Sequence, residues 1–334
     1  MANILYQGAP TSYSEIATKK FFGKDSNCIG VNTFAEIYEL LEAKSAYYAA
    51  IPIENSVIGP IWENDDLLPF HDVEVVGEHY LRIEHCLLST LEGNIGGLKK
   101  VLSHPKALEQ CRKFFRKHPW IEPVVHFDTA GAAREIAISG NIETAAIASS
   151  ETAAVYGLTI LQKNLEDNPQ NFTRFIFIRQ KRAAMECDMA DKCSLVFSVQ
   201  HQPGTLHHVL AEFADKKVNI TRIASRPMLG RPFEEIAKLQ FGAKSALFVQ
   251  DPDSAQIAYP KSSMSICAET GPAQKSSNLA SKASFAIPSF EYLFYIDCEF
   301  VAERKKEVEM ILEKMKQQAA FFKLLGFYKR GNDR

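Results

Sequence analysis

A hydroxyl and a guanidinium stand next to each other in the middle of the chain, at Thr173 and Arg174, just before the apolar run at residues 176–178. We expect both residues in a loop that enters a strand. An alcohol at such a place can donate a hydrogen bond to a departing group, and a guanidinium can balance the charge of an anionic ligand. Taken alone, residues 171–175 favour a plainer alternative, a capping threonine and a solvated arginine.

Small polar residues also follow four predicted strands, at residues 12–14, 54–56, 103–104 and 129–131. In open α/β sheets, ligands bind beyond the carboxyl ends of the strands. Helix N-termini at these ends offer unpaired N–H groups and the positive end of the helix dipole. The pattern therefore predicts an anion-binding cleft, although serine and threonine at such positions most often only cap helices.

Alternating elements in the first half of the chain would position these residues. Apolar runs predict strands at residues 4–6, 49–53, 73–76, 86–88, 101–103 and 145–148. Helical spacing and caps predict helices at residues 12–20, 33–41, 105–115, 129–137 and 149–156. Alternation of this kind favours a mostly parallel sheet that is covered on both faces.

The pattern changes at residues 179–192, which are charged and irregular and predict a linker. Strands are then expected at residues 195–200, 218–226, 291–300 and 321–328, with helices at 206–216 and 303–318. This order is that of a ferredoxin-like fold. The long segment at about 229–288 is expected to be a hairpin insertion, with one further strand at 246–249.

Composition excludes several classes of function. The chain has 334 residues, a hydrophobic fraction of 46% and a net charge of −2, so nothing favours binding to nucleic acid or to an acidic membrane surface. No apolar run is long enough to span a bilayer, and the N-terminus does not resemble a signal or transit peptide. The seven scattered cysteines indicate free thiols in a reducing cytoplasm.

Cofactor motifs are missing as well. The histidines and cysteines lack metal-ligand spacing, and no glycine-rich dinucleotide loop or P-loop is present. We therefore expect a reaction that uses no metal, nucleotide or organic cofactor.

Taken in chain order, the polar motifs resemble those of the prephenate dehydratase family and are similar to those of plant arogenate dehydratases. The matching segments are residues 8–14, 52–56, 103–108, 128–133, 144–149 and the Thr-Arg-Phe signature at 173–175, followed by 203–206 and 224–227. The resemblance covers nearly the whole chain. It implies an α/β fold: a two-lobed catalytic domain like a type 2 periplasmic binding protein (residues 1–181), a linker (182–192) and a ferredoxin-like ACT regulatory domain (193–330) with the insertion.

The resemblance also implies a reaction and its site. Prephenate would lose carbon dioxide and its ring hydroxyl to give phenylpyruvate, on the route to L-phenylalanine, with Thr173 as the catalytic donor to the leaving hydroxyl. The residues implied to bind substrate are Ser12, Ser14, Asn55, Ser56, His104, Thr129, Gly131, Ala132, Arg174 and Phe175.

Three of the polar residues have structural alternatives. A carboxylate beside a dianion would repel it, so Glu54 is expected to turn away from the cleft and accept hydrogen bonds elsewhere. Arg174 balances substrate charge or forms an ion pair within the domain. His104 contacts substrate or caps a helix.

The second domain implies binding of phenylalanine between subunits of a homodimer or homotetramer. The implied effector residues are Pro203, Gly204, Thr205, Leu206, Ala224, Ser225, Arg226 and Pro227. Three positions depart from the family pattern: Thr11 replaces a glycine, Lys106 a glutamine and Ala224 a glutamate. Loss of that glutamate leaves open an ACT domain that only assembles subunits.

Two other functions stay open at this stage. Arogenate dehydratases act on a substrate that differs from prephenate in an amino group in place of a keto group. A non-catalytic amino-acid sensor is the alternative of a different class, because both halves resemble folds that bind small ligands.

Overall fold

The structure is a computed structural model that describes residues 2–90, 93–181, 187–227 and 292–331. The segment expected to be an insertion, at about 229–288, and the strand expected at 246–249 lie outside these ranges. None of the helices in the described ranges combines the length and the apolar character needed to cross a bilayer.

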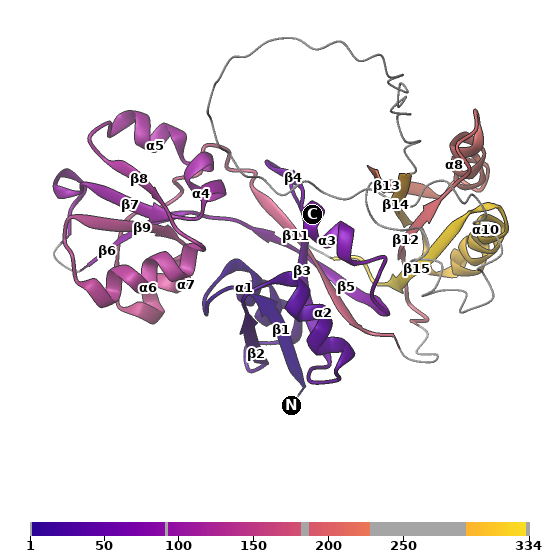
Figure 1. Ribbon diagram of the computed structural model, residues 1–334, viewed down its shortest axis with the longest axis horizontal. Coiled ribbons are helices and arrows are strands. Elements are labelled where there is room, and N and C mark those ends of the chain that lie inside the picture. Colours follow the sequence, from indigo (N-terminus) through magenta and orange to yellow (C-terminus); the bar gives the residue numbers. More distant parts are fainter. Residues whose placement is uncertain (1, 91–92, 182–186, 228–291, 332–334) are drawn as a thin grey trace, which may run out of the picture. The chain divides into compact units, whose positions relative to one another are not determined.

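The first lobe is built on a sheet with the strand order β2-β1-β3-β11-β5 (Figure 1). Its strands are β1 (Asn3–Gln7), β2 (Asn27–Val31), β3 (Tyr48–Asn55), β5 (Val73–Arg82) and β11 (Phe172–Gln180), with the short β4 (Gly59–Pro60) paired to β3. Its helices are α1 (Tyr13–Phe22), α2 (Phe34–Glu42) and α3 (Trp62–Leu67).

Local sequence signals explain where two of these helices begin. The side chain of Ser12 accepts the backbone N–H of Glu15 at the start of α1. At the start of α2, Thr33 accepts the backbone N–H of Glu36, as its spacing from that glutamate predicts. The apolar stripe of α2 then buries Ile37 and Leu41 completely.

The second lobe has the strand order β10-β6-β9-β7-β8. Its strands are β6 (Cys86–Ser89), β7 (Lys100–Ser103), β8 (Glu122–Val125), β9 (Thr144–Ala148) and β10 (Thr159–Gln162). Its helices are α4 (Pro105–Gln110), α5 (Arg112–Lys117), α6 (Thr129–Ser139) and α7 (Ser150–Tyr156), with a 3-10 turn η1 (Ile95–Gly97). Alternate residues of its strands bury into two cores, with Leu87 on one face of β6 and Leu88 on the other.

The expectation of mostly parallel sheets is only partly right. β1 is parallel to β2 and β3, and β7 is parallel to β8 and β9. However, β11 runs antiparallel to both β3 and β5, because the chain leaves the first lobe after β5 and returns to it through β11. Thr173 and Arg174 therefore lie inside a central strand, and not in the loop expected before it.

Some elements were not predicted. The strands β2, β8 and β10 and the helix α3 carry weak apolar patterns, and the helix expected at 105–115 divides at Cys111 into α4 and α5. These elements lie at sheet edges or in short turns, where few positions are buried and periodicity is correspondingly weak.

The C-terminal domain has the strand order β13-β14-β12-β15, which confirms the ferredoxin-like fold. Its strands are β12 (Lys192–Ser198), β13 (Asn219–Pro227), β14 (Tyr292–Glu299) and β15 (Phe321–Tyr328). Its helices are α8 (Thr205–Asp215) and α10 (Lys305–Gln318), the second preceded by a 3-10 turn η3 (Ala302–Arg304). Val308, Ile311 and Met315 of α10 pack on the sheet with Phe213 of α8.

Candidate active site

Pairing of β3 with β11 creates two residue pairs with different surroundings. Asn55 lies opposite Thr173, and Glu54 lies opposite Arg174. Because successive side chains of a strand point to opposite faces, the two pairs occupy opposite faces of the sheet. Asn55 Nδ2 donates to Thr173 Oγ1 at 2.9 Å, whereas Arg174 Nη1 bonds Glu54 Oε1 at 3.1 Å on the other face.

Backbone donors fix the orientation of the Asn55 amide. The N–H groups of Val57 and Ile58 both donate to Asn55 Oδ1 at 2.9 Å. Rotating the amide by half a turn would leave each N–H facing an NH2 group, at a cost of about 1–3 kcal/mol per lost bond. Asn55 Nδ2 therefore faces Thr173, whose oxygen accepts.

The proton of the Thr173 hydroxyl is consequently uncommitted. Within the described ranges, no side chain or carbonyl accepts it. The residue is 8% exposed, so the hydroxyl is screened from bulk solvent. A screened alcohol that is held as an acceptor by the protein offers its single proton to a ligand.

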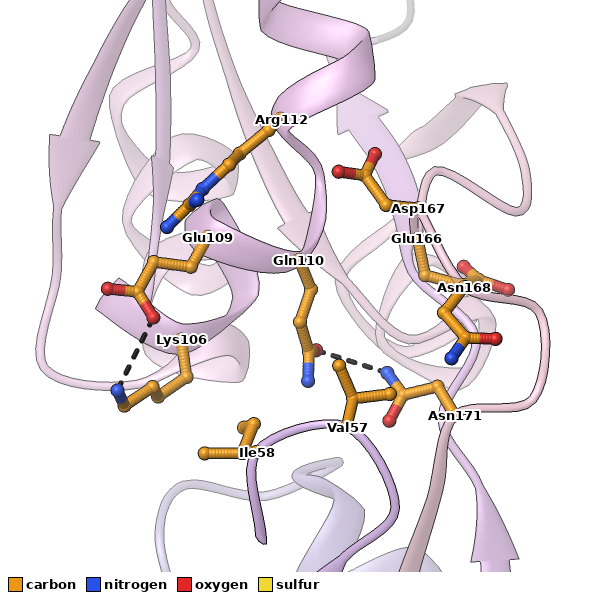
Figure 2. A pocket seen from close by; sticks show the side chains of 10 residues that line it. All are labelled: Val57, Ile58, Lys106, Glu109, Gln110, Arg112, Glu166, Asp167, Asn168 and Asn171. Carbon is orange, nitrogen blue, oxygen red and sulfur yellow. Dashed lines mark hydrogen bonds and ion pairs between the residues drawn. The ribbon is translucent and has the colours of Figure 1, made fainter.

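A cavity of about 420 Å³ lies next to this pair, between the β3–β4 loop of the first lobe, α4 of the second and the segment that precedes β11 (Figure 2). It is lined by Val57, Ile58, Lys106, Glu109, Gln110, Arg112, Glu166, Asp167, Asn168 and Asn171. Asn171 in its wall accepts from Asn55 Nδ2 at 2.8 Å. Thr173 is not a lining residue and stands two hydrogen bonds behind that wall, through Asn55.

Cations and carboxylates share the cavity. Lys106 pairs with Glu109 at 3.3 Å, and Figure 2 shows Arg112 extending along the same side. In the described part of the chain, Arg112 forms no ion pair, so its guanidinium is available to an anionic ligand. Lys106, one of the departures from the family pattern, does lie at this cavity.

Several helix N-termini that were expected to bind an anion are instead occupied by their own caps. His104 Nδ1 accepts the N–H of Lys106 at 3.2 Å at the start of α4, which is its alternative capping role. At the start of α6, Asp128 Oδ1 accepts a hydrogen bond from the N–H of Gly131. Burial lowers the pKa of His104, which favours the neutral ring that such an acceptor needs.

Residues 4–183, more than half of the chain, match the family model of prephenate dehydratase. The chain belongs to the prephenate dehydratase family. Members of this family are carbon–oxygen lyases, and the two-lobed and ferredoxin-like domains are the folds expected for it.

Known proteins agree with this assignment. An Arabidopsis thaliana relative, arogenate dehydratase/prephenate dehydratase 2, is 33% identical over 97% of this chain and 72% of its own length. Prephenate dehydratase of Methanocaldococcus jannaschii is 38% identical over 67% of this chain and 82% of its own length. The prephenate dehydratase of Arthrobacter aurescens, solved in complex with L-Phe, shares the fold with a TM-score of 0.74 at 23% identity, over 99% of this chain and 91% of that one.

The structure corrects the substrate role expected of Arg174. Its side chain is 2% exposed and bonds Glu78 at 2.7 Å, Asp297 at 2.5 Å and the Tyr328 hydroxyl at 3.1 Å, besides Glu54. Burial opposes its charge, but these neighbours hold the pKa of Arg174 well above its ordinary value. Alternation along β11 turns Arg174 away from the cavity, and the residue forms the ion pairs of the alternative, with Glu54 and Glu78 in its own domain and also with Asp297 of the C-terminal domain. Glu54, as expected, is turned away too.

Other expected substrate contacts are buried or tied down. Ala132 is fully buried in the core of the second lobe, and Phe175 is 2% exposed in the core of the first. The Ser56 hydroxyl donates to the Gln170 carbonyl at 2.7 Å and accepts from the backbone of β11. The side chains of Ala132 and Phe175 therefore pack in the cores, and a substrate contact by the backbone at either position stays a prediction.

The remaining expected contacts surround the start of two helices. Ser12 and Ser14 of the first lobe are each 8% exposed, and Ser12 caps α1. Thr129 is the first residue of α6 and is partly exposed. A substrate role for Ser14 or Thr129 stays a prediction.

Two residues near Thr173 were missed. Gln110 Oε1 accepts from Asn171 Nδ2 at 3.1 Å, as Figure 2 shows. Asn171 could have been found, because it lies two residues before Thr173 and thus on the same side of the strand path. Gln110 is four residues after Lys106 on one helix face, but no local signal marks it as functional.

Thr11 shows the strain expected where the family has glycine. Its φ is 71°, in the left-handed region that β-branched residues avoid. Its hydroxyl bonds that of Thr152 at 3.0 Å, and its carbonyl accepts from Ser149 at 3.3 Å. The loop after β1 thereby holds the second lobe to the first.

The expected effector residues lie in one domain, in the turn before α8, in the first two residues of α8 and on β13. Gly204 has a φ of 86° at the N-cap of α8, where glycine is favoured. Arg226 makes two hydrogen bonds to Asp66 of the first lobe and stacks 4.8 Å from the centre of the Trp62 ring. Arg226 is therefore engaged within the chain, while phenylalanine binding stays a prediction.

Proposed function

We propose that this protein catalyses the decarboxylative dehydration of prephenate to phenylpyruvate, in the biosynthesis of phenylalanine. The observation that carries the proposal is the Thr173 hydroxyl, which accepts from Asn55 and keeps its own proton for a ligand. This alcohol stands beside a cavity that holds two cationic side chains.

Formation of the aromatic ring supplies the driving force of the reaction, so little catalysis is required of the protein. The bond from the ring to the carboxylate carbon breaks, and its electron pair enters the ring as carbon dioxide leaves. The bond from the ring to oxygen breaks on the opposite carbon, and its electron pair leaves with hydroxide. Thr173 stabilises that oxygen through a hydrogen bond, and the hydroxide becomes water with a proton that solvent finally supplies.

The cavity fits a dianion with an apolar ring. Arg112 supplies positive charge for a carboxylate, and Lys106, which also pairs with Glu109, supplies a second charge, while Val57 and Ile58 supply apolar surface for the ring. Amide groups of Gln110 and Asn171 supply neutral donors or acceptors between them. Glu166 and Asp167 line the same cavity, so the substrate carboxylates must lie on the side of the two cations. A cavity of about 420 Å³ lies within the usual size range for sites that bind small molecules.

Access to Thr173 requires a movement, because the hydroxyl is screened from the cavity. The contact between Thr11 and Thr152 and the bond from the Ala9 N–H to Asp128 Oδ2 at 3.3 Å both join the two lobes. We propose that substrate enters when these contacts open, and that their closure excludes water from the leaving group.

Thr173→Val tests the catalytic role, because valine keeps the shape and removes the hydroxyl. Turnover of prephenate should fall by on the order of 100-fold or more, while unfolding is little changed. Thr144→Val, in β9 and away from the cavity, is the matched control and should retain native turnover. Native turnover in the Thr173 variant would refute the proposed role, and binding of substrate by the wild type without turnover would support a sensor.

Arogenate is the second candidate substrate, favoured by relatives whose names include arogenate dehydratase. The two substrates give products that differ in kind, a keto acid and an amino acid. Incubating the protein with each and quantifying both products separates the two activities. We place prephenate first because residues 4–183 match the family model of prephenate dehydratase, although Glu166 and Asp167 at the cavity are carboxylates that could receive the arogenate amino group.

For the C-terminal domain we propose binding of phenylalanine and assembly into a homodimer or homotetramer. The proposal is supported by its ferredoxin-like fold and by the ion pairs that join it to the first lobe through Arg174 and Arg222. Titration of phenylalanine into the activity assay tests the regulation, and a flat response up to millimolar concentration would exclude it. Sedimentation of the protein gives its state of assembly.

A further inference from the structure

Hydrogen-bonded side chains continue from Thr173 and Asn55 to a buried histidine between the lobes. Asn171 donates to Gln110 Oε1, and the same oxygen lies 2.8 Å from Nε2 of His85. On its other side, His85 Nδ1 lies 3.0 Å from the hydroxyl of Tyr13. The side chains from Thr173 to His85 are almost fully buried.

The donors and acceptors along this chain all follow from its fixed end. Backbone N–H groups hold Asn55 Oδ1, so Asn55 Nδ2 faces both Thr173 and Asn171. Asn171 must then present Oδ1 to Asn55 and Nδ2 to Gln110.

The oxygen of Gln110 consequently faces both Asn171 and His85, and an oxygen can only accept. His85 must therefore carry its proton on Nε2. Burial lowers the pKa of His85, which favours the neutral ring, and Nδ1 then carries no proton. The Tyr13 hydroxyl lies 3.0 Å from Nδ1 and 2.8 Å from the Glu84 carbonyl oxygen, and its single proton is shared between these two acceptors.

The position of His85 is itself held firmly. It lies where the chain first passes between the lobes, and its N–H donates to Glu166 Oε2 at 2.9 Å. Its carbonyl accepts the N–H of Leu165, in the segment that returns to the first lobe, also at 2.9 Å. The backbone of His85 is thus bonded to the segment that returns to the first lobe, whereas Gln110 belongs to the second lobe and Thr173 to the first.

We propose that His85 is a positioning residue for Thr173. Its Nε2–H holds the Gln110 amide, which holds Asn171, and together with Asn55 this chain keeps the Thr173 hydroxyl as an acceptor toward the protein and a donor toward the substrate. The inference rests on the proposed role of Thr173 in the reaction. His85 touches no substrate, so its loss affects turnover more than binding.

Steady-state kinetics with prephenate test the proposal in wild type, His85→Leu, His85→Gln and the same changes combined with Thr173→Val. His85→Leu should lower kcat by about 10- to 100-fold, the range that follows from misplacing a catalytic group, and should leave KM within about twofold. His85→Gln keeps an N–H near the position of Nε2 and should retain most of the activity. In the Thr173→Val background, His85→Leu should lower kcat by less than about twofold, because it acts through a hydroxyl that is already gone.

Other outcomes would contradict either this proposal or the proposed function on which it rests. Native kcat in His85→Leu, or an equal loss in the presence and absence of the Thr173 hydroxyl, would overturn the proposal and leave the role of Thr173 intact. Native kcat in Thr173→Val would instead overturn the proposed function itself. Should His85→Leu not fold, His85→Gln and His85→Asn give the same contrast. Asparagine reaches only the position of Nδ1, so it should lose activity where glutamine retains it, and equal activity of the two would contradict the proposal.

Discussion

The two arginines of β11 offer a direct test of what Arg174 does. Both Arg174 and Arg179 pair with a glutamate of the neighbouring strand β5, at 2.7 Å and 2.6 Å. Arg174 is 2% exposed as a side chain, however, whereas Arg179 is 13% exposed and its partner Glu74 is 18% exposed. The substitution to methionine at each position therefore removes the same group from two different environments.

Replacing Arg174 leaves Asp297 as the most affected partner. Glu78 keeps Lys192 at 2.9 Å, but Asp297 Oδ2 loses its 2.5 Å bond and keeps only the Ser194 bond on its other oxygen. Breaking a buried pair in this way costs about 3–5 kcal/mol. For Arg174→Met we expect a loss of about 4 kcal/mol in the free energy of unfolding, and for Arg179→Met about 1 kcal/mol.

Urea unfolding followed by tryptophan fluorescence measures both values. A double variant, Arg174→Met with Asp297→Asn, should be less destabilised than the sum of the two single variants, because the second change removes the stranded charge. Equal loss in the Arg174 and Arg179 variants would refute the argument from burial. A raised KM with native stability in Arg174→Met would restore the substrate contact that the structure argues against.

Three further predictions concern other parts of the chain. Gly326→Ala should lower the free energy of unfolding by about 2 kcal/mol, because a Cβ there would lie 2.4 Å from the Val75 carbonyl oxygen. The control Gly97→Ala meets only ordinary contacts and should leave the stability almost unchanged. Equal unfolding midpoints of the two variants would contradict this prediction. Thr11→Val keeps the left-handed strain and loses the bond to Thr152, so its free energy of unfolding should fall by about 1 kcal/mol. In Thr11→Gly the loss of the same bond is offset by about 1–2 kcal/mol of relieved strain. A valine variant as stable as wild type would show that the Thr152 contact contributes nothing to stability. The pKa of His85 is lowered from 6.5 in the folded state. The stability of wild type relative to His85→Gln should therefore be greatest above pH 6.5 and should fall by at most about 1.4 kcal/mol per pH unit below it, until the folded ring protonates. A stability difference that does not change between pH 7 and pH 5 would contradict the buried neutral ring.

Much of the site's local chemistry was predictable from short segments. The caps at Ser12 and Thr33 follow from spacing along a single helix, and the turning away of Glu54 follows from charge repulsion alone. The order of strands and helices after residue 192 was enough to predict the ferredoxin-like domain. These features depend on interactions between residues that are close in sequence, or on an order of elements that admits few folds.

The direction of each side chain in the site depended on the tertiary structure. Thr173 and Asn55 are 118 positions apart, and only the pairing of β11 with β3 makes them neighbours. That pairing forms because the chain returns to the first lobe after building the second, which no local pattern specifies. Gln110 and His85 enter the same network for this reason, and Arg174 is excluded from the cavity by the alternation of the strand that carries Thr173.

The sequence by itself thus determined the family and the starts of several helices, and it predicted the alcohol proposed to donate to a leaving group, because these are properties of motifs and local spacing. Only the tertiary structure decided which polar groups meet that alcohol and which face the C-terminal domain. The physical reason is that strand pairing joins distant segments, and a shift of one residue in its register would exchange the two faces.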